Sequence, residues 1–149
     1  MLDIRTIADI HAPPDAVWKA LTDLPKYPEW NPYITRATGA VQPGERLELR
    51  VEPPGGSART VRPVVIEAEP NRELSWVEEG WLPGMLDGHH SFSIISKGQN
   101  RTHVVHRATF TGLLLPFMRA RIETSLREGL EAMNRALKGR AQGGAGPGL

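Results

Sequence analysis

The chain of 149 residues contains no cysteine. This absence excludes a disulfide framework, a thiolate nucleophile and every zinc or iron–sulfur site that depends on cysteine. Charge of one sign is also lacking, because 18 lysines and arginines stand against 17 aspartates and glutamates. A strongly basic face is the usual mark of a nucleic-acid-binding protein, so we expect no nucleic-acid partner.

Long hydrophobic runs are missing as well. No apolar stretch approaches the roughly 20 residues that a membrane-spanning helix needs. The opening segment MLDIRTIADI carries acids and has no apolar core of signal-peptide length. We therefore expect a cytoplasmic protein without stable membrane insertion, built as one ordinary domain that is long enough to bury its own core.

The sequence does contain a series of short strand patterns. Alternating apolar residues over 2–11 predict a half-buried strand, and Pro14 then begins a short helix that ends near residue 23. Six further strands are expected at residues 34–38, 46–51, 59–69, 73–79, 89–96 and 101–111. The turns between them are rich in glycine, proline and asparagine, which favour hairpins. Pro63, inside the third of these six patterns, indicates an edge position or a bulge.

A long amphipathic helix is expected over residues 116–138, with an apolar stripe at spacings of three and four. The glycine-rich residues 139–149 are expected to form a flexible tail, which leaves a single domain at 1–138. Because short hairpins make neighbouring strands antiparallel, the prediction is an α+β fold. Its seven-stranded curved antiparallel sheet surrounds the long C-terminal helix, with short helices between strands one and two. Such a sheet can enclose a ligand cavity.

The order of these elements, and the motifs at their ends, resemble those of the START-like or Bet v 1-like (SRPBCC) superfamily, including its polyketide cyclase/dehydrase and lipid-transport group. The motifs that carry the resemblance are Ile10-x-Ala12-Pro13 with Val17-Trp18, Leu21-x-Asp23, Tyr27-Pro28-x-Trp30-Asn31-Pro32, Leu74-x-Trp76, Gly88-x-His90-x-Phe92, Thr102-x-x-x-His106 and Phe110-x-Gly112-x-x-x-Pro116. The resemblance covers about residues 2–138. One departure is Ala108, where similar sequences often carry glutamate.

The resemblance implies a helix-grip fold with an internal cavity, and it does not imply one reaction. Proteins of the superfamily bind lipids, sterols, polyketides, hormones or alkaloid precursors, and some act as co-chaperones. The expectation for this chain therefore rests on analogy of fold until its own residues are examined.

Two histidines are the candidate chemical centre. By alternation, His90 and His106 both face the inside of the sheet. If residues 97–99 form the connecting loop, His90 lies directly opposite His106, with side chains about 5 Å apart. The pair could supply acid and base near neutral pH. Two alternatives remain open: polar contact with a ligand, and a structural role in which each histidine bonds the other, water or Tyr33.

The candidate ligand-binding residues are aromatic or large apolar side chains expected near the cavity, together with the two histidines. They are Trp30, Tyr33, Trp76, Trp81, Met85, His90, Phe92, His106, Phe110, Phe117, Met118 and Ile122. Several have a second interpretation. Trp30 could simply close the open end of the fold, and the loop with Trp81 could be a lid or plain packing. The apolar segment 113–118 could form a pocket entrance or a homodimer contact.

These observations favour binding, transport or sequestration of a small hydrophobic molecule, such as a lipid, a sterol or a polyketide-like compound. The first alternative is an enzyme of the polyketide cyclase, aromatase or dehydratase kind that uses the cavity histidines. The second is a protein-interaction or co-chaperone-like module. No cofactor is expected, and no metal site, since two histidines without a third ligand fall short of the usual set.

Overall fold

The computed structural model describes residues 1–78 and 84–143. Its elements follow in the order β1 (Leu2–Ile10), α1 (Pro14–Thr22), η1 (Leu24–Glu29), β2 (Ile34–Thr38), β3 (Glu48–Val51), β4 (Arg59–Val61), β5 (Val64–Glu69), β6 (Glu73–Glu78), β7 (Asp87–Ser96), β8 (Thr102–Thr111) and α2 (Leu115–Gly143). Among the described residues, no helix combines the length and apolar composition needed to cross a membrane.

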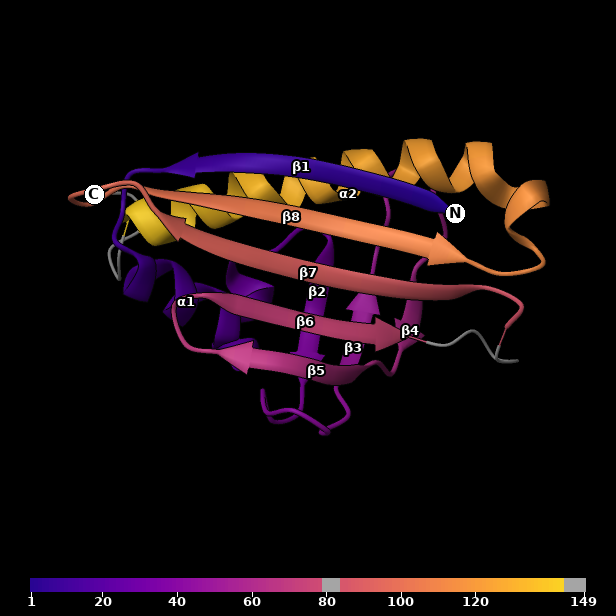
Figure 1. Ribbon diagram of the computed structural model, residues 1–149, viewed down its shortest axis with the longest axis horizontal. Helices are drawn as coiled ribbons and strands as arrows, with labels where there is room; N and C mark the ends of the chain where they lie inside the picture. The colour runs from indigo at the N-terminus through magenta and orange to yellow at the C-terminus, as the bar shows by residue number, and fades with distance from the viewer. Residues whose placement is uncertain (79–83, 144–149) are drawn as a thin grey trace.

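The strands form two antiparallel sheets. The larger has the order β1-β8-β7-β6-β5, and the smaller has the order β2-β3-β4. In Figure 1 the long strands of the larger sheet run across the view, α2 lies behind β1 and β8, and the smaller sheet crosses behind β6 and β5. The expected α+β arrangement of a long C-terminal helix on an antiparallel sheet is confirmed. The expected count of seven strands is wrong, because the described residues form eight.

The extra strand arises at Pro63. The sequence predicts one strand over 59–69, but β4 ends at Val61 and β5 begins at Val64, in the other sheet. Proline has no N–H to donate to a strand ladder, so pairing cannot continue through it. Its carbonyl still accepts from the backbone N–H of Leu47 at 2.9 Å. Arg46, expected inside a strand, makes only an isolated bridge to Val64.

The first strand lies beside the last one. Strand β1 pairs with β8 from Leu2 opposite Phe110 to Ile10 opposite Thr102. The inner row of β1 is buried and apolar apart from Thr6, as its alternation predicted. This pairing places β8 between β1 and β7, and its His106 side chain meets Asn134 of α2.

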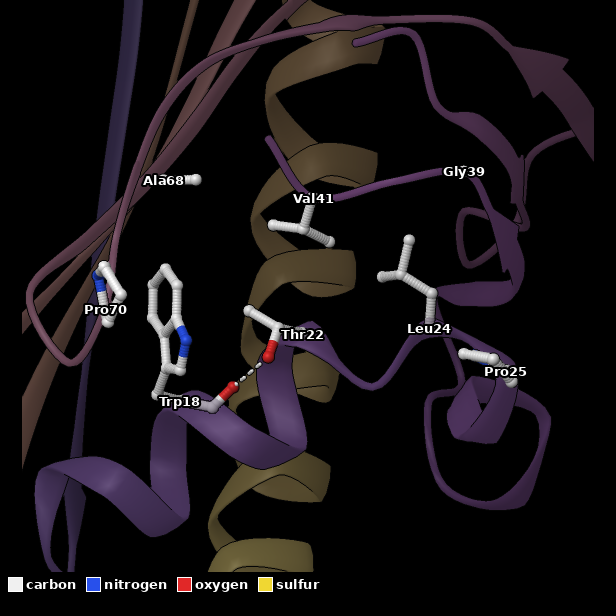
Figure 2. Close-up of a pocket in the computed structure, with 8 residues that line it drawn as sticks. All are labelled: Trp18, Thr22, Leu24, Pro25, Gly39, Val41, Ala68 and Pro70. Carbon is white, nitrogen blue, oxygen red and sulfur yellow. Dashed lines mark hydrogen bonds between the residues drawn. The ribbon is translucent and has the colours of Figure 1, made fainter. Parts of the chain in front are cut away.

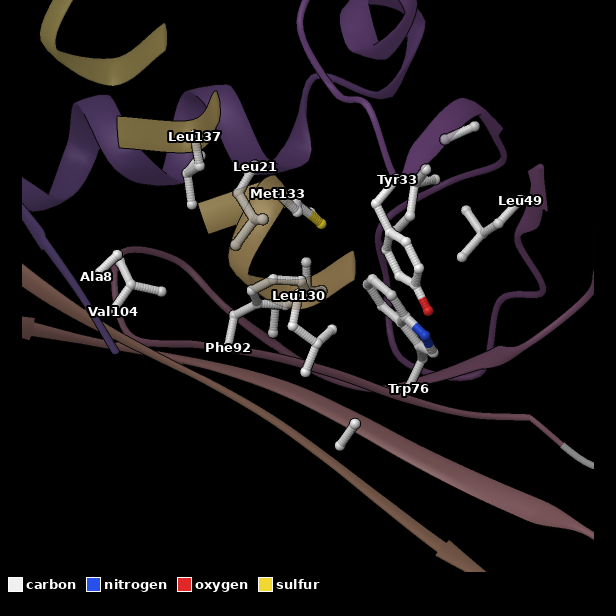
Figure 3. Packing of buried hydrophobic residues seen from close by; sticks show 14 of the residues in the cluster. Ala8, Leu21, Tyr33, Leu49, Trp76, Phe92, Val104, Leu130, Met133 and Leu137 are labelled. Atoms are coloured by element: carbon white, nitrogen blue, oxygen red, sulfur yellow. The ribbon is translucent and has the colours of Figure 1, made fainter. Parts of the chain in front are cut away.

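Helix α2 is longer than expected. It continues through Gly143, so residues 139–143 of the expected tail are helical, and residues 144–149 lie outside the described residues. Two features stabilise this extra turn. The Ala141 side chain is buried, and Gln142 Oε1 accepts a hydrogen bond from the backbone N–H of His11 at 2.8 Å. Figure 3 shows Leu130, Met133 and Leu137 of α2 directed toward the inner face of the sheet.

Candidate ligand-binding and acid–base site

Aromatic rings line the inner face of β6, β7 and β8. Trp76 stacks on His90 with ring centroids 6.0 Å apart, and Phe92 stacks on His106 at 4.0 Å. Phe110 meets the His90 ring edge-on at 5.8 Å. Each stacked pair is also a cross-strand pair in the sheet register. The rings make a continuous apolar wall into which both imidazoles are set.

The two histidines are diagonal neighbours, which corrects the prediction that they face each other directly. His90 lies opposite Ala108, and Phe92 lies opposite His106. The cause is the hairpin between β7 and β8: Ser96 pairs with Thr102, so the connection is residues 97–101 and not 97–99. Both imidazoles still share the inner face and are buried.

His106 is held by a closed set of hydrogen bonds. The Thr6 hydroxyl donates to the His106 carbonyl at 3.2 Å, and the Asn134 Nδ2 donates to that hydroxyl oxygen at 2.7 Å. The amide oxygen of Asn134 is then left to face His106 Nδ1 at 3.1 Å. Because an amide oxygen can only accept, neutral His106 carries its proton on Nδ1 and has a lone pair on Nε2.

The charge state of His106 follows from its surroundings. Burial, aided by the charge of nearby His90 and opposed by the hydrogen bond to Asn134, lowers the pKa of His106 to about 3. The imidazole is therefore neutral at physiological pH. It can accept a hydrogen bond through Nε2, but it is not a cation there.

Glu78 supplies a carboxylate beside the other histidine. Its Oε1 lies 3.6 Å from His90 Nε2 and 3.8 Å from Arg59 Nη2, and the Glu78 side chain is only 12% exposed. Burial alone would raise the pKa of Glu78, but His90 and Arg59 together outweigh burial and hold it below its usual value. The carboxylate is therefore ionised at neutral pH.

Gly88 makes room for this carboxylate. It pairs with Glu78 across the ladder between β6 and β7. A Cβ atom on Gly88 would lie 2.9 Å from Phe110 Cε1 and 3.3 Å from Glu78 Oε1. Any larger residue would therefore push apart the two side chains that flank His90.

Tyr33 closes the interior from the side of the smaller sheet. The Asn31 side chain holds the turn before β2, because its Oδ1 accepts from the backbone N–H groups of Tyr33 and Ile34, both at 2.9 Å. Burial raises the pKa of Tyr33 to about 12; the charge of Arg59 opposes this rise and that of Glu78 adds to it. Among the described residues, no hydrogen bond engages the Tyr33 hydroxyl. Figure 3 shows its ring reaching toward Trp76.

Side chains fill almost all of this interior. The space that remains is about 10 Å³, about one water-sized sphere. Its lining joins the two sheets: Tyr33, Ile34, Leu49, Val51, Arg59, Val61, Trp76, Glu78, His90 and His106. The sequence led us to expect an internal cavity of unstated size, and the space among these residues is only about 10 Å³.

A larger hollow of about 340 Å³ lies elsewhere, between α1, η1 and the loops around Val41 and Pro70 (Figure 2). Its lining contains no titratable side chain, and the Thr22 hydroxyl donates to the Trp18 carbonyl at 2.7 Å. This hollow could therefore accommodate a molecule, but its lining has no group for acid–base chemistry.

The structure brings together only some of the predicted site residues. Tyr33, Trp76, His90 and His106 line the internal space, and Phe92 and Phe110 pack behind the histidine rings. Five other predicted residues do not line this space: Trp30, Met85, Phe117, Met118 and Ile122.

Each of those others has its own position. Trp30 packs edge-on against Tyr27 at 5.1 Å, and Ile122 packs against the core. Met85 and Met118 are half-buried, and Phe117 is exposed. Trp81 lies outside the described residues.

Three residues of this site were not singled out from the sequence: Glu78, Arg59 and Asn134. A signal for Glu78 was present, because it continues the inward alternation of Leu74 and Trp76 along β6. Asn134 lies four residues after Leu130, on the buried face of α2. Among residues 1–78 and 84–143, no group of three or more acidic or histidine side chains could hold a metal ion.

Chemically, the arrangement offers three functions in one aromatic-walled space. Ionised Glu78 can orient and stabilise a charged His90, which is the arrangement used for general acid–base catalysis. The Tyr33 hydroxyl stays protonated and can donate a hydrogen bond, and His106 Nε2 can accept one.

Comparison with solved structures places this fold among known proteins. The structure is similar to the Zhui aromatase/cyclase from Streptomyces sp. R1128, with a TM-score of 0.79 at 17% identity over 95% of this chain and 94% of that one. A START superfamily protein from Mycobacterium smegmatis gives 0.74 at 20% identity over 93% and 96%. Norcoclaurine synthase from Thalictrum flavum, solved with dopamine and hydroxybenzaldehyde, gives 0.69 at 13% over 92% and 84%.

At these identities the similarity shows the fold alone. No curated protein matches the sequence. The profile of the family described as polyketide cyclase / dehydrase and lipid transport matches residues 1–138. The chain belongs to the polyketide cyclase/dehydrase and lipid transport family.

Proposed function

We propose that the protein binds a small, mainly hydrophobic molecule of aromatic or polyketide-like character in the interior between the two sheets and α2. The observation that carries this proposal is the set of inward polar atoms that the protein leaves free within an aromatic wall. Chief among them is the Tyr33 hydroxyl, on a side chain that is only 5% exposed. No partner for this hydroxyl lies among the described residues, so it is available to donate a hydrogen bond to a ligand.

Binding requires the interior to open, because 10 Å³ does not admit a ligand. The interior can open most easily at β4, because this strand has three residues and, among the described residues, pairs with β3 alone. Arg59 on β4 is half-exposed and reaches Glu78 at 3.8 Å, so it can swing into solvent at small cost. The ligand then gains about 25 cal/mol for each Å² of apolar surface that it buries.

Two tyrosine variants test this proposal. Tyr33→Phe removes only the free hydroxyl, so it should keep the fold and weaken ligand binding. Tyr27→Phe is the matched control, since the Tyr27 hydroxyl donates to the Leu21 carbonyl at 2.5 Å and Tyr27 does not line the interior space. It should lower stability and leave ligand affinity unchanged.

The measurement is thermal stabilisation and native mass spectrometry with planar polyphenols, polyketide-like aromatics, sterols and fatty acids. We expect a ligand-dependent rise in Tm that is smaller in Tyr33→Phe. The proposal fails if no compound in the panel binds, or if Tyr33→Phe and Tyr27→Phe bind the same compounds equally well.

The Glu78–His90 pair favours a second candidate function, an acid–base enzyme of the cyclase or dehydratase kind. In a dehydration, His90 would take the proton from the carbon next to a carbonyl while Tyr33 donates a hydrogen bond to the carbonyl oxygen. The protonated His90 would then give this proton to the β-hydroxyl, which leaves as water as the carbon–carbon double bond forms. Glu78 would stabilise the protonated imidazole.

Glu78→Gln distinguishes catalysis from binding alone. In an enzyme, this variant should lower kcat for a β-hydroxyketone substrate by about 100-fold, within the range for a lost acid–base contribution, while thermal shifts by ligands persist. Glu73→Gln is the control, because Glu73 lies at the other end of β6 and accepts from the Ser93 hydroxyl. Equal turnover in the two variants would remove the pair from the mechanism.

A further inference from the structure

Large apolar side chains stand exposed where α2 begins. Phe117 is 86% exposed, and Leu113 and Met1 are each 73% exposed. They lie at one end of the molecule: the Arg119 side chain donates to the Met1 carbonyl at 3.1 Å, which ties the start of β1 to the start of α2. Figure 1 shows both starting points at the same end. We call Met1, Leu113 and Phe117 the Phe117 patch.

The exposure of this patch is built into the backbone. Gly112 has a φ of +135°, and a Cβ atom there would lie 2.3 Å from the Met85 carbonyl oxygen. The next two backbone amides are also hydrogen-bonded: Leu113 N–H donates to the Gly84 carbonyl at 3.1 Å, and Leu114 N–H donates to the Met85 carbonyl at 2.9 Å. The turn therefore cannot relax to cover its own apolar side chains.

The helix phase fixes the direction of Phe117. Leu115, at the first position of α2, is buried with 5% exposure. Two residues later the helix has rotated by about 200°, so Phe117 must point away from the sheet. Nothing within the described residues shields it.

Positive charge accompanies the patch. Arg121 is exposed about one turn after Phe117 and so shares its face of α2. Arg119 points to another face, where its exposed side chain reaches the Met1 carbonyl of the patch. The first turn of α2 has no acidic residue. Exposed Phe and Leu beside arginines are the pattern of a surface that rests in the headgroup region of a membrane. We propose that the Phe117 patch docks on an anionic phospholipid surface.

A second copy of the chain fits this patch less well. Three side chains of this size bury on the order of 500 Å², below the roughly 800 Å² per partner of a stable interface. In a twofold dimer the same patch meets itself, so Arg119 and Arg121 would approach their own copies. An anionic surface instead gains from those charges and needs only a few inserted side chains.

Co-sedimentation with vesicles tests the proposal without any small ligand, so it does not depend on the proposed internal site. We expect binding to phosphatidylcholine vesicles that contain phosphatidylglycerol, and much weaker binding to phosphatidylcholine alone. Phe117→Ser should weaken binding by about tenfold or more. Arg121→Gln should weaken it by about fivefold, and added salt should do the same.

Ile7→Ser is the matched control. Ile7 is 64% exposed on β1 but lies outside the patch, so its loss should leave vesicle binding unchanged. The proposal is overturned if the anionic vesicles do not bind the wild type, or if Ile7→Ser weakens binding as much as Phe117→Ser. It is also overturned if sedimentation shows a dimer that Phe117→Ser converts to a monomer, because the patch then belongs to a second copy.

Discussion

Replacing Gly129 with alanine should change the stability of the protein in two opposite ways. Gly129 lies in the middle of α2, where alanine is the better helix former by about 1 kcal/mol. However, a Cβ atom at this position would lie 2.4 Å from Cε1 and 2.5 Å from Cδ1 of Tyr33. Ordinary carbon contacts are about 3.5–4.0 Å, so the Tyr33 ring or the helix would have to move by about 1 Å.

The size of the net effect follows from these distances. Overpacking of a buried site costs about 1–3 kcal/mol, and the clash with a buried ring belongs at the upper end of that range. We expect Gly129→Ala to lower the free energy of unfolding by about 1–2 kcal/mol after the gain in helix propensity. In a Tyr33→Ala background the clash is gone, so the same substitution should raise stability by about 1 kcal/mol.

Urea denaturation of the four proteins of this double-mutant cycle measures the change of sign. Gly139→Ala is the control, because Gly139 is an exposed residue of the same helix and a Cβ atom there meets nothing within 4 Å. It should stabilise the protein in both backgrounds. If Gly129→Ala stabilises the wild type as much as Gly139→Ala does, the close packing of Tyr33 on α2 is refuted.

Two further predictions concern buried polar groups. Burial lowers the pKa of His106 to about 3 in the folded protein, against about 6.5 for an unperturbed histidine, so the unfolded chain binds more protons between these values and stability falls as pH drops through that window. The free energy of unfolding should change by up to about 1.4 kcal/mol per pH unit in this window. His106→Gln should remove this contribution, which urea midpoints at pH 6 and pH 4 measure for both proteins. Equal pH dependence in the wild type and the variant would contradict the prediction. Asn31→Ala should cost about 2–4 kcal/mol, because two buried N–H groups lose their acceptor. Asn31→Asp keeps that acceptor but puts a second carboxylate oxygen where the buried Nδ2 has no partner among the described residues, so its midpoint should lie between those of the wild type and Asn31→Ala. A wild-type midpoint for Asn31→Ala would refute the role of Oδ1.

Local patterns predicted most of the fold. The alternation in β1 and β8 and the apolar stripe of α2 reflect one buried face each, so they can be read without tertiary information. The break at Pro63 was visible as an edge or bulge signal. That it divides two sheets depends on where the chain on each side finds partners, which no local pattern contains.

The candidate site was less predictable, because it depends on register and on distant contacts. The hairpin after β7 takes positive φ at both Gly98 and Asn100. It therefore spans residues 97–101, which moves His106 from opposite His90 to opposite Phe92. The size of the interior could not be predicted either, since it is set by how closely Tyr33 approaches Gly129 on an element far away in the sequence.

The pairing of β1 with β8 has a consequence for how the chain acquires its structure. Leu2 meets Phe110, and Ile10 meets Thr102, so β1 has no strand partner until most of the chain has been synthesised. Contacts this distant in sequence make folding slow and leave an apolar strand open to wrong pairing meanwhile. The charged residues Asp3, Arg5 and Asp9 leave no apolar run on β1 longer than the two residues Ile7 and Ala8. Such charges discourage intermolecular pairing before β8 has been synthesised.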